Sequence, residues 1–349
     1  MIWESIIKKW FIFTLLHMLL FLTGCTFYDG DAMDGYMGSD DPCFLTVRND
    51  SGTDTPYVYI SNDGKHWNQV SVVPLAEVQV LAYGEGLFVA GGKPAGTSGD
   101  LIAYSPDGIN WDTTITWNGP ETPVNNDFIR AMDYNNGTFI CSFYDISVTV
   151  PPKDKFYYSH NGIEWHAGNG ASSQTPYSMR YGGGIFVLLA IFDLQVSSDG
   201  INWSGDIWDS TSIRLCSVAY GNTLFVVGGD DTSSSSAFLA LSDDGYTYTN
   251  NLLLDNNVDL IIDIFYGNRK FVALSQDGYT YVSDNGFIWD GPSQIKDAVG
   301  ETMLRIVYGN NLFVTVSHDG IYYSEDGIHW SGNVAPAGPG LFIDIVYRP

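Results

Sequence analysis

The chain has 349 residues, of which 45% are hydrophobic and 16% charged, so it is long enough to bury a large core and is not a disordered chain. Acidic residues outnumber basic ones 40 to 15, and the net charge of −25 argues against a nucleic-acid partner, because such a chain cannot neutralise a run of phosphates. The 38 glycines and the 15% aromatic content favour short strands joined by tight turns.

The N-terminus has the pattern of an export signal. Two adjacent lysines precede an apolar stretch, Trp10–Leu22, that is short for a membrane-spanning helix. The stretch ends in Leu-Thr-Gly-Cys25, which resembles the lipobox of bacterial lipoproteins. The resemblance implies a signal peptide over 1–24, lipidation of Cys25, and a lipid-anchored position in the bacterial cell envelope outside the cytoplasm. In a Gram-negative cell, Thr26 after the cysteine favours the outer membrane. An uncleaved anchor is the alternative.

Residues 25–42 are acidic, contain glycine and show no periodicity, which predicts a flexible acidic tether. Without the leader, 13 basic and 39 acidic residues remain, so the exported part would be repelled by anionic lipids and the acyl chains would have to hold it at the membrane. The remaining cysteines, Cys43, Cys141 and Cys216, lie in apolar strand patterns. Because three cannot all pair, we expect buried free thiols.

A box of the form Ser-x-Asp/Asn-Gly-x-x-Trp/Tyr occurs seven times, and its aromatic residues recur at intervals of 38 to 54 residues. Its carboxyl or amide side chain is expected to cap the N–H groups of a tight turn, and its aromatic ring to pack beneath that turn. We therefore predict structural roles for Asp63, Asp107, Asn161, Asp199, Asp244, Asn285 and Asp326, and for Trp67, Trp111, Trp165, Trp203, Tyr248, Trp289 and Trp330.

A second signature, Tyr-Gly-x-x-x-Phe-Val, precedes most boxes. It begins at Tyr83, Tyr181, Tyr220, Tyr266 and Tyr308, with a weaker copy at Tyr134 and a half-copy ending at Tyr347. Each repeat then gives four strands: A ends at the Tyr, B begins at the Phe, C ends at the box Ser and D begins at the box aromatic.

Seven such units over 43–349 predict an all-β fold, a seven-bladed β-propeller of four-stranded antiparallel blades. The first unit lacks strand A: Cys43–Val47 is similar in pattern to Leu312–Val316, a strand B. The last segment, Leu341–Tyr347, is a strand A with nothing after it. We therefore expect the C-terminal strand to complete the N-terminal blade and close the ring.

The boxes resemble the Asp-box (BNR) repeats of sialidase-like propellers, although here the Asp/Asn and Gly are adjacent, which makes the box one residue shorter. That family includes glycosidases, sorting receptors and assembly factors. The resemblance therefore implies a scaffold and leaves the activity open.

The A–B turns and the boxes should share one face, and the longer B–C and D–A connections the other, where we expect any site. Trp117 and Trp208, in D strands or D–A connections, suit stacking on sugars or packing between blades. Arg130, Arg214 and Arg305 are expected near the starts of three inner strands, by the central channel, where they could hold an anion. They resemble the three arginines with which sialidases hold a carboxylate. However, they precede their Tyr by four, six and three residues, which would turn Arg305 to the opposite strand face.

No catalytic set emerges. The Arg-Ile-Pro start of the sialidase family is missing and its Tyr–Glu nucleophile pair cannot be assigned. The histidines lie at turns and pair with no Cys, so we expect no metal and no cofactor. The sequence favours a lipid-anchored binding or scaffold module for a protein or glycan at the cell envelope. The alternatives are a surface glycoside hydrolase or lyase of sialidase-like type and a purely structural envelope protein.

Overall fold

The computed structural model describes residues 41, 43–50, 52–95, 101–118, 128–144, 154–169, 176–190, 192–205, 207–208, 210–254, 258, 260–298, 300–338 and 340–349. By its internal contacts the chain divides into Met1–Met37 and Gly38–Pro349, and all described residues belong to the second unit. The predicted signal peptide, Cys25 and all of the predicted tether except Asp41 lie outside the described residues. Among the described residues, no helix is both long enough and apolar enough to cross a bilayer.

The described residues form seven β-sheets and a single short 3-10 helix, η1 (Lys296–Ala298). In spatial order, the first sheet contains β26 (Leu341–Arg348), β1 (Cys43–Asp50), β2 (Thr55–Ser61) and β3 (Asn68–Val72). The second contains β4 (Leu75–Gly84), β5 (Leu87–Pro94) and β6 (Ile102–Ser105). The third contains β8 (Phe128–Asn135), β9 (Thr138–Tyr144), β10 (Asp154–Ser159), β11 (Glu164–Ala167) and β7 (Thr116–Asn118).

The remaining four sheets follow the chain without a crossover. The fourth contains β12 (Pro176–Gly182), β13 (Ile185–Ala190) and β14 (Asp193–Ser197), and the fifth contains β15 (Ile213–Gly221), β16 (Leu224–Asp231), β17 (Ser236–Ser242) and β18 (Thr249–Leu253). The sixth contains β19 (Ile261–Gly267), β20 (Lys270–Ser275), β21 (Tyr279–Ser283) and β22 (Asp290–Gln294). The seventh contains β23 (Met303–Gly309), β24 (Leu312–Ser317) and β25 (Ile321–Ser324).

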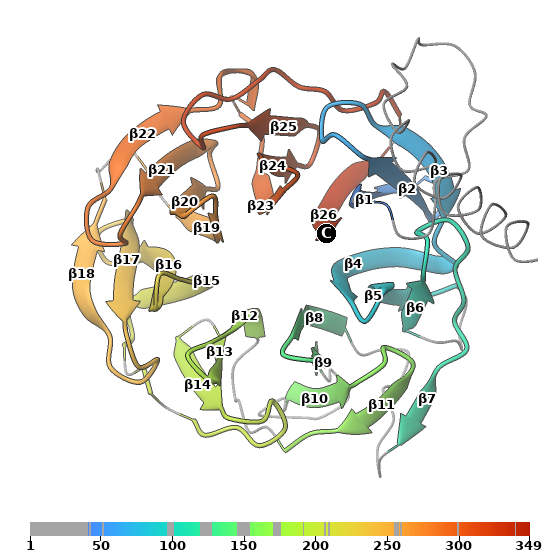
Figure 1. The fold of residues 1–349 in the computed structure, drawn as a ribbon, viewed down its shortest axis with the longest axis horizontal. Helices are drawn as coiled ribbons and strands as arrows, with labels where there is room; N and C mark the ends of the chain where they lie inside the picture. The colour runs from blue at the N-terminus through green and yellow to red at the C-terminus, as the bar shows by residue number, and fades with distance from the viewer. Residues whose placement is uncertain are drawn as a thin grey trace, which may run out of the picture. The chain divides into compact units, whose positions relative to one another are not determined.

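Within Gly38–Pro349 the sheets stand around a central opening, each with one strand innermost (Figure 1). The innermost strands are β26, β4, β8, β12, β15, β19 and β23; each contacts the next in this order, and β23 contacts β26. Apolar residues of neighbouring sheets pack together, as in the cluster of Val187, Val196 and Val218. This arrangement is a β-propeller, the fold class that the repeat predicted.

The two sequence signatures meet in the same way in each sheet. The Phe that begins strand B is paired with the box Ser that ends strand C: Phe88 with Ser105, Phe139 with Ser159, Phe186 with Ser197, Phe225 with Ser242, Phe271 with Ser283 and Phe313 with Ser324. The A–B turns and the box turns therefore lie at the same end of every sheet, as the sequence predicted. We call this end the box face.

The first and the last described strands meet in the first sheet. β26 pairs antiparallel with β1, with Phe44 opposite Tyr347, while Phe44 is also opposite the box Ser61 of β2. Arg348 is buried and donates to the carbonyl oxygens of Asp41 (2.8 Å) and Pro106 (3.2 Å). β1 therefore takes the strand B position that its similarity to Leu312–Val316 predicted.

The outer strands depart from the predicted four-stranded pattern. Three sheets contain three strands, and beyond them the chain is joined by single bridges such as Tyr104–Asp112. There, the Asp112 carboxylate accepts from the Thr114 N–H at 2.7 Å, and the chain leaves its own sheet. β7 then pairs in parallel with β11 of the next sheet, so this outer strand joins neighbouring sheets.

Candidate functional site

Every innermost strand carries a β-bulge at the same position, four residues before its Tyr. The extra residues are Gln79, Arg130, Tyr177, Cys216, Ile262, Leu304 and Ile343. A bulge restarts the alternation of side chains along a strand. The odd–even count by which the sequence separated Arg305 from Arg214 therefore does not apply across it. Both guanidinium groups act electrostatically on the Cys216 thiol.

The residue after the bulge links neighbouring sheets. In four of the innermost strands its side-chain oxygen accepts a hydrogen bond from a backbone N–H of the next innermost strand. The bonds are Val218 N–H to Ser178 (3.2 Å), Ile264 N–H to Ser217 (2.8 Å), Ile306 N–H to Asp263 (2.9 Å) and Leu81 N–H to Asp344 (2.9 Å). Val80, Ala131 and Arg305 occupy this position in the other three strands.

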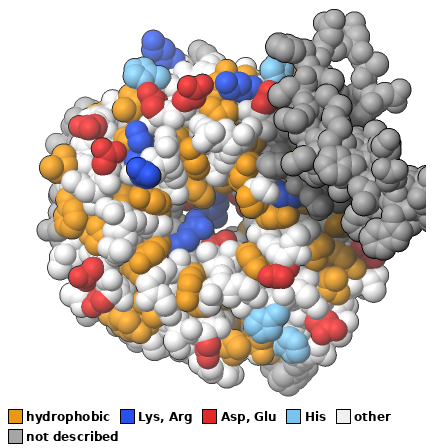
Figure 2. Space-filling view, in the orientation of Figure 1, with side chains coloured by type: hydrophobic (Ala, Val, Ile, Leu, Met, Phe, Trp, Pro, Cys, Tyr) orange, Lys and Arg blue, Asp and Glu red, His pale blue; other side chains and the backbone are white. Residues whose placement is uncertain are grey.

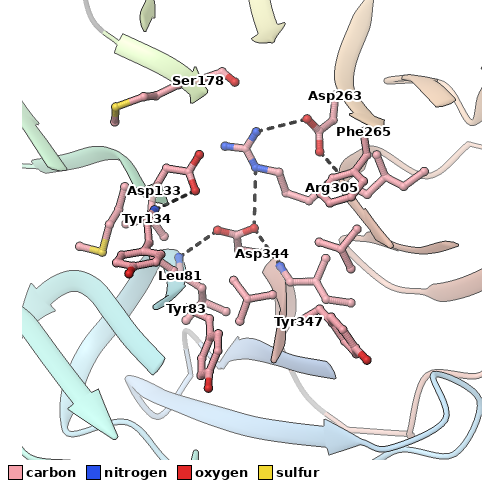
Figure 3. A pocket seen from close by; sticks show the side chains of 18 of the residues that line it. Leu81, Tyr83, Asp133, Tyr134, Ser178, Asp263, Phe265, Arg305, Asp344 and Tyr347 are labelled. Atoms are coloured by element: carbon pink, nitrogen blue, oxygen red, sulfur yellow. Dashed lines mark hydrogen bonds and ion pairs between the residues drawn. The ribbon is translucent and has the colours of Figure 1, made fainter. Parts of the chain in front are cut away.

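Arg305 is the cation among these positions. Its side chain extends across the central opening, which we call the channel, between the carboxylates of Asp263 and Asp344 (Figure 3). Its Nη1 lies 3.9 Å from Asp263 Oδ1, and its Nε lies 3.7 Å from Asp344 Oδ1. Its Nη2 donates to the Tyr177 carbonyl oxygen at 3.4 Å. The side chain as a whole remains 30% exposed.

A second arginine faces the same channel from β12. Arg180 Nη1 lies 3.5 Å from Asp133 Oδ2, and the guanidinium carbon lies over the Phe265 ring, 5.6 Å from its centre. Its side chain is 28% exposed. The charge of Arg305 also acts on Asp133, so Arg180 and Arg305 both favour the ionised form of this carboxyl.

These side chains line a cavity of about 320 Å³ in the central opening. The lining comes from β4, β8, β12, β19, β23 and β26, and includes Tyr83, Tyr134, Tyr308 and Tyr347 toward the A–B turns. Figure 2 shows basic side chains inside the opening of an otherwise mixed surface. The cavity thus lies between the inner strands, whereas the sequence pointed to the B–C and D–A loops, of which 96–100 and 145–153 lie outside the described residues.

Burial sets the protonation of the carboxyls. It raises the pKa of Asp344 to about 6 despite the opposing charge of Arg305, and it raises the pKa of Asp133 despite Arg180. For Arg305, burial acts to lower the pKa, but the charges of Asp263, Asp344 and Asp133 outweigh it and the pKa is raised. The three carboxylates thus keep Arg305 charged. The raised pKa values of Asp344 and Asp133 reduce the negative charge beside it.

In the channel, the carboxylate acceptors already have hydrogen-bond partners, whereas most N–H donors of Arg305 have none in the part of the chain that the structure describes. Both oxygens of Asp344 accept backbone N–H groups, from Leu81 and Ile345, and Asp263 is bound in the same way. The guanidinium of Arg305 has five N–H donors and makes one hydrogen bond, a long one, among the described residues. The channel therefore offers N–H donors to an acceptor, such as a carboxylate or carbonyl group.

Among the side chains that the structure describes, the binding candidates Trp117, Trp208 and Arg214 are not gathered into one site. Trp117, in β7, packs edge-on against Phe143 and Tyr157, with ring centres 5.8 and 5.1 Å apart. Trp208 packs in the same way against Phe238 and Tyr248, at 5.8 and 5.7 Å. Both rings thus sit against core aromatics, which was the alternative to sugar stacking.

The other two binding candidates of the sequence are Arg130 and Arg214. Arg214 forms a two-point ion pair with Asp230, opposite it on β16, with Nε–Oδ1 and Nη2–Oδ2 distances of 2.8 and 2.9 Å. Arg130 is the bulge residue of β8, and its side chain lies outside the described residues. Arg180 was missed because it matches no motif. Its position one residue before the strand-ending Tyr was the available signal.

The box residues have a common geometry. In the first box, Asp63 Oδ1 accepts the N–H groups of Lys65 and His66, both at 2.8 Å, and Ser61 Oγ accepts the Gly64 N–H at 2.9 Å. Trp67 Nε1 donates to the Gly64 carbonyl at 3.2 Å. The carboxylates or amides of Asp107, Asn161, Asp199, Asp244, Asn285 and Asp326 accept the corresponding pair of N–H groups.

Among the described residues, no group of three or more His, Cys, Asp or Glu side chains is arranged to hold a metal ion. Cys43, Cys141 and Cys216 are buried and free. Burial raises the pKa of the Cys43 and Cys216 thiols to about 11 and that of Cys141 well above its usual value, so these thiols stay protonated.

Solved structures place the chain among the β-propellers. It is similar to YCF48 solved bound to D1 peptide, with a TM-score of 0.52 and 13% identity over 74% of this chain and 81% of that one. It is also similar to the computationally designed Ika8 protein, with a TM-score of 0.53 and 12% identity over 87% and 90%. No family model and no curated protein matches the sequence.

A third similar structure is the GH74 enzyme of Niastella koreensis, with a TM-score of 0.50 and 14% identity over 82% of this chain. The match spans 56% of that enzyme's chain. At these identities the similarities show a shared fold and leave the activity open.

Proposed function

We propose that this chain is a lipid-anchored, extracytoplasmic seven-bladed propeller that binds a segment of another protein at the bacterial cell envelope. Seven sheets in a ring of touching inner strands, and the pairing of β26 with β1, support one closed ring with a shared first blade. The Leu-Thr-Gly-Cys25 sequence after an apolar stretch supports the lipid anchor.

The observation that carries the binding proposal is the surplus of N–H donors in the channel. The carboxylates of Asp263 and Asp344 are occupied by the backbone of neighbouring strands, whereas Arg180 and Arg305 are partly exposed and loosely paired. A peptide segment with an acidic side chain supplies the matching acceptors. YCF48, a propeller of similar fold, was solved with a peptide bound, which gives a precedent for this ligand class.

The test uses the full-length lipidated protein in detergent and short fluorescent peptides with an amidated C-terminus that contain Asp or Glu, with the corresponding Asn and Gln peptides as isosteric controls. The acidic peptides should bind more tightly, and Arg305→Gln and Arg180→Gln should remove that preference. Arg269→Gln, at an exposed A–B turn, should retain it. Equal binding of acidic and neutral peptides, or binding unaffected by Arg305→Gln, would refute the proposal.

The same preparation tests the anchor and the enzyme alternative. Metabolic labelling with a radioactive fatty acid should mark the wild type and leave Cys25→Ala unlabelled. Turnover of a glycan panel that is lost on changing a channel carboxylate such as Asp133 would instead identify a hydrolase. Binding of a glycan without turnover would replace the peptide by a sugar ligand.

A further inference from the structure

The point at which the chain enters the fold lies on the box face. Cys43 is at the end of β1 that lies beside Ser61, the first residue of a box, because Phe44 is paired with Ser61 and Asp50 with Thr55 at the far end. Arg348 then holds the carbonyl of Asp41 beside the carbonyl of Pro106, which belongs to the second box. A lipid attached upstream therefore connects to this face.

The box face also carries an apolar ring. The first residue after the box Gly is apolar in six of the seven boxes and none of the six is fully buried. These residues are Ile109, Ile163, Ile201, Tyr246, Phe287 and Ile328; Lys65 occupies the position in the remaining box. Of these six, Tyr246 and Phe287 are exposed, whereas the four isoleucines are partly buried. The turn itself does not need an exposed apolar side chain, because its hydrogen bonds use the Ser and the Asp or Asn.

The ring is most apolar on the fifth and sixth sheets. Tyr246 is 50% exposed, Phe287 49% and Ile288 72%, and the last two follow each other in one turn. In the other boxes the residue corresponding to Ile288 is polar or charged, for example Thr247 in the adjacent sheet. Exposed aromatic and aliphatic side chains on one face are typical of surfaces that contact another protein or enter the membrane interface, and the proposed lipid anchor favours the membrane.

We propose that the box face, through Tyr246, Phe287 and Ile288, docks on the surface of a lipid bilayer of zwitterionic lipids, so that the opposite face and its channel mouth point away from the membrane. This rests on the proposed lipid anchor. The fifteen residues Thr26–Asp40 can extend at most about 50 Å, so they keep the domain near the bilayer without fixing its orientation. The apolar turns then select the orientation.

The charges around these turns decide the lipid class. Asp243 and Asp284 lie in the same two box turns and are exposed, and the chain as a whole carries a net charge of −25. Anionic lipids would repel such a surface, whereas zwitterionic headgroups would not. The apolar side chains thus supply the attraction, and the acyl anchor supplies the local concentration.

Site-directed spin labelling of the lipidated full-length protein in phosphatidylcholine vesicles tests this orientation. A nitroxide is placed at Ile288→Cys, or at Ser234→Cys in the β16–β17 turn at the opposite end of the fifth sheet as the matched control. The native Cys43, Cys141 and Cys216 are buried, so they do not compete for the label. Collision rates with oxygen, which enters lipid, and with a water-soluble nickel chelate then report depth.

The label at 288 should collide several-fold less with the nickel chelate, and more with oxygen, than the label at 234. Equal accessibility of the two labels would overturn membrane docking, and a lipid-exposed label at 234 would overturn the orientation. If the wild-type protein does not float with the vesicles at all, the lipid anchor itself fails. Flotation with equal labels rejects only the docking surface, so the two failures are distinguishable.

Discussion

The ring of Tyr266 lies directly over Gly221 of the neighbouring inner strand, and a Cβ added at Gly221 would come within 2.0 Å of the Tyr266 Cγ atom. The same contact joins Gly84 to Tyr134, Gly182 to Tyr220, Gly267 to Tyr308 and Gly309 to Tyr347. The Tyr-Gly pairs of the sequence are thus one half of an interface between neighbouring sheets: each Gly receives the Tyr of the next sheet.

Gly221→Ala should therefore lower stability by separating two sheets. A methyl group at this distance from an aromatic ring forces the ring or the strand to move, and such overpacking costs about 2–3 kcal/mol. Gly205→Ala is the matched control, because the nearest atom to its added Cβ is Gln195 Nε2 at 3.6 Å. Urea unfolding followed by tryptophan fluorescence measures both. Similar midpoints for the two variants would refute the role of the Tyr–Gly contact.

The box carboxylates should make stability depend on acid pH. Hydrogen bonds from the backbone N–H and side chain of Asn202 lower the pKa of Asp199 well below its usual value. A carboxyl with a lowered pKa in the folded state contributes stability above its unfolded value of about 4, and this contribution is lost as the pH falls toward the folded pKa. Asp199→Asn should thus destabilise the protein at pH 7, and by less at pH 3.

Two boxes provide a natural control for this prediction, because Asn161 and Asn285 already occupy the carboxyl position. Asn285→Asp should have the opposite effect, adding stability at pH 7 that disappears in acid. Since these side chains are largely exposed, solvent screening should keep each change within about 1 kcal/mol. The midpoints of urea unfolding at pH 7, 5 and 3 test this prediction. Midpoint shifts that are the same at all three pH values in both variants would contradict it.

The sequence predicted the repeat, the strand order and the end at which the turns lie, because each of these follows from a local pattern repeated seven times. It placed Arg305 by the central channel but did not predict Arg180 or the carboxylates that face both arginines. The bulge residues, such as Cys216 and Ile262, differ in type from strand to strand, so no sequence pattern marks them. The alternation of side chains therefore could not be followed across them. Arg180 and Arg305 come from sheets far apart in sequence, and only the ring brings both near Asp133.

Removing Arg305, one of the two channel arginines, should make the stability of the protein more sensitive to pH. The pKa of Asp344 in the fold, about 6, is above its unfolded value of about 4, so its contribution is fully present below pH 4 and is lost as the pH rises through 6. Arg305→Met removes the charge that opposes this, and the pKa of Asp344 should rise further.

The variant should therefore melt at nearly the wild-type temperature at pH 4.5 and well below it at pH 8, a difference of about 2–3 kcal/mol at the higher pH. Differential scanning calorimetry across this range measures it. Arg214→Met serves as the comparison, because its partner Asp230 lies outside the channel lining and Asp344 should keep its titration there. A pH-independent loss for Arg305→Met would show that the arginine acts through packing alone.

Arg348, the buried arginine where β26 pairs with β1, should matter more than an exposed arginine. Arg348 donates to the carbonyls of Asp41 and Pro106, and its guanidinium lies 5.3 Å from the centre of the Phe88 ring. Arg348→Met keeps the volume but leaves two carbonyl oxygens without this donor, which costs about 2–4 kcal/mol. Arg269→Met, at an exposed turn, should cost less than about 0.5 kcal/mol. β26 holds the first sheet to its neighbours, so the Arg348→Met variant should also unfold faster in urea. An unchanged unfolding rate would argue that the pairing of β26 with β1 is not what keeps the ring intact.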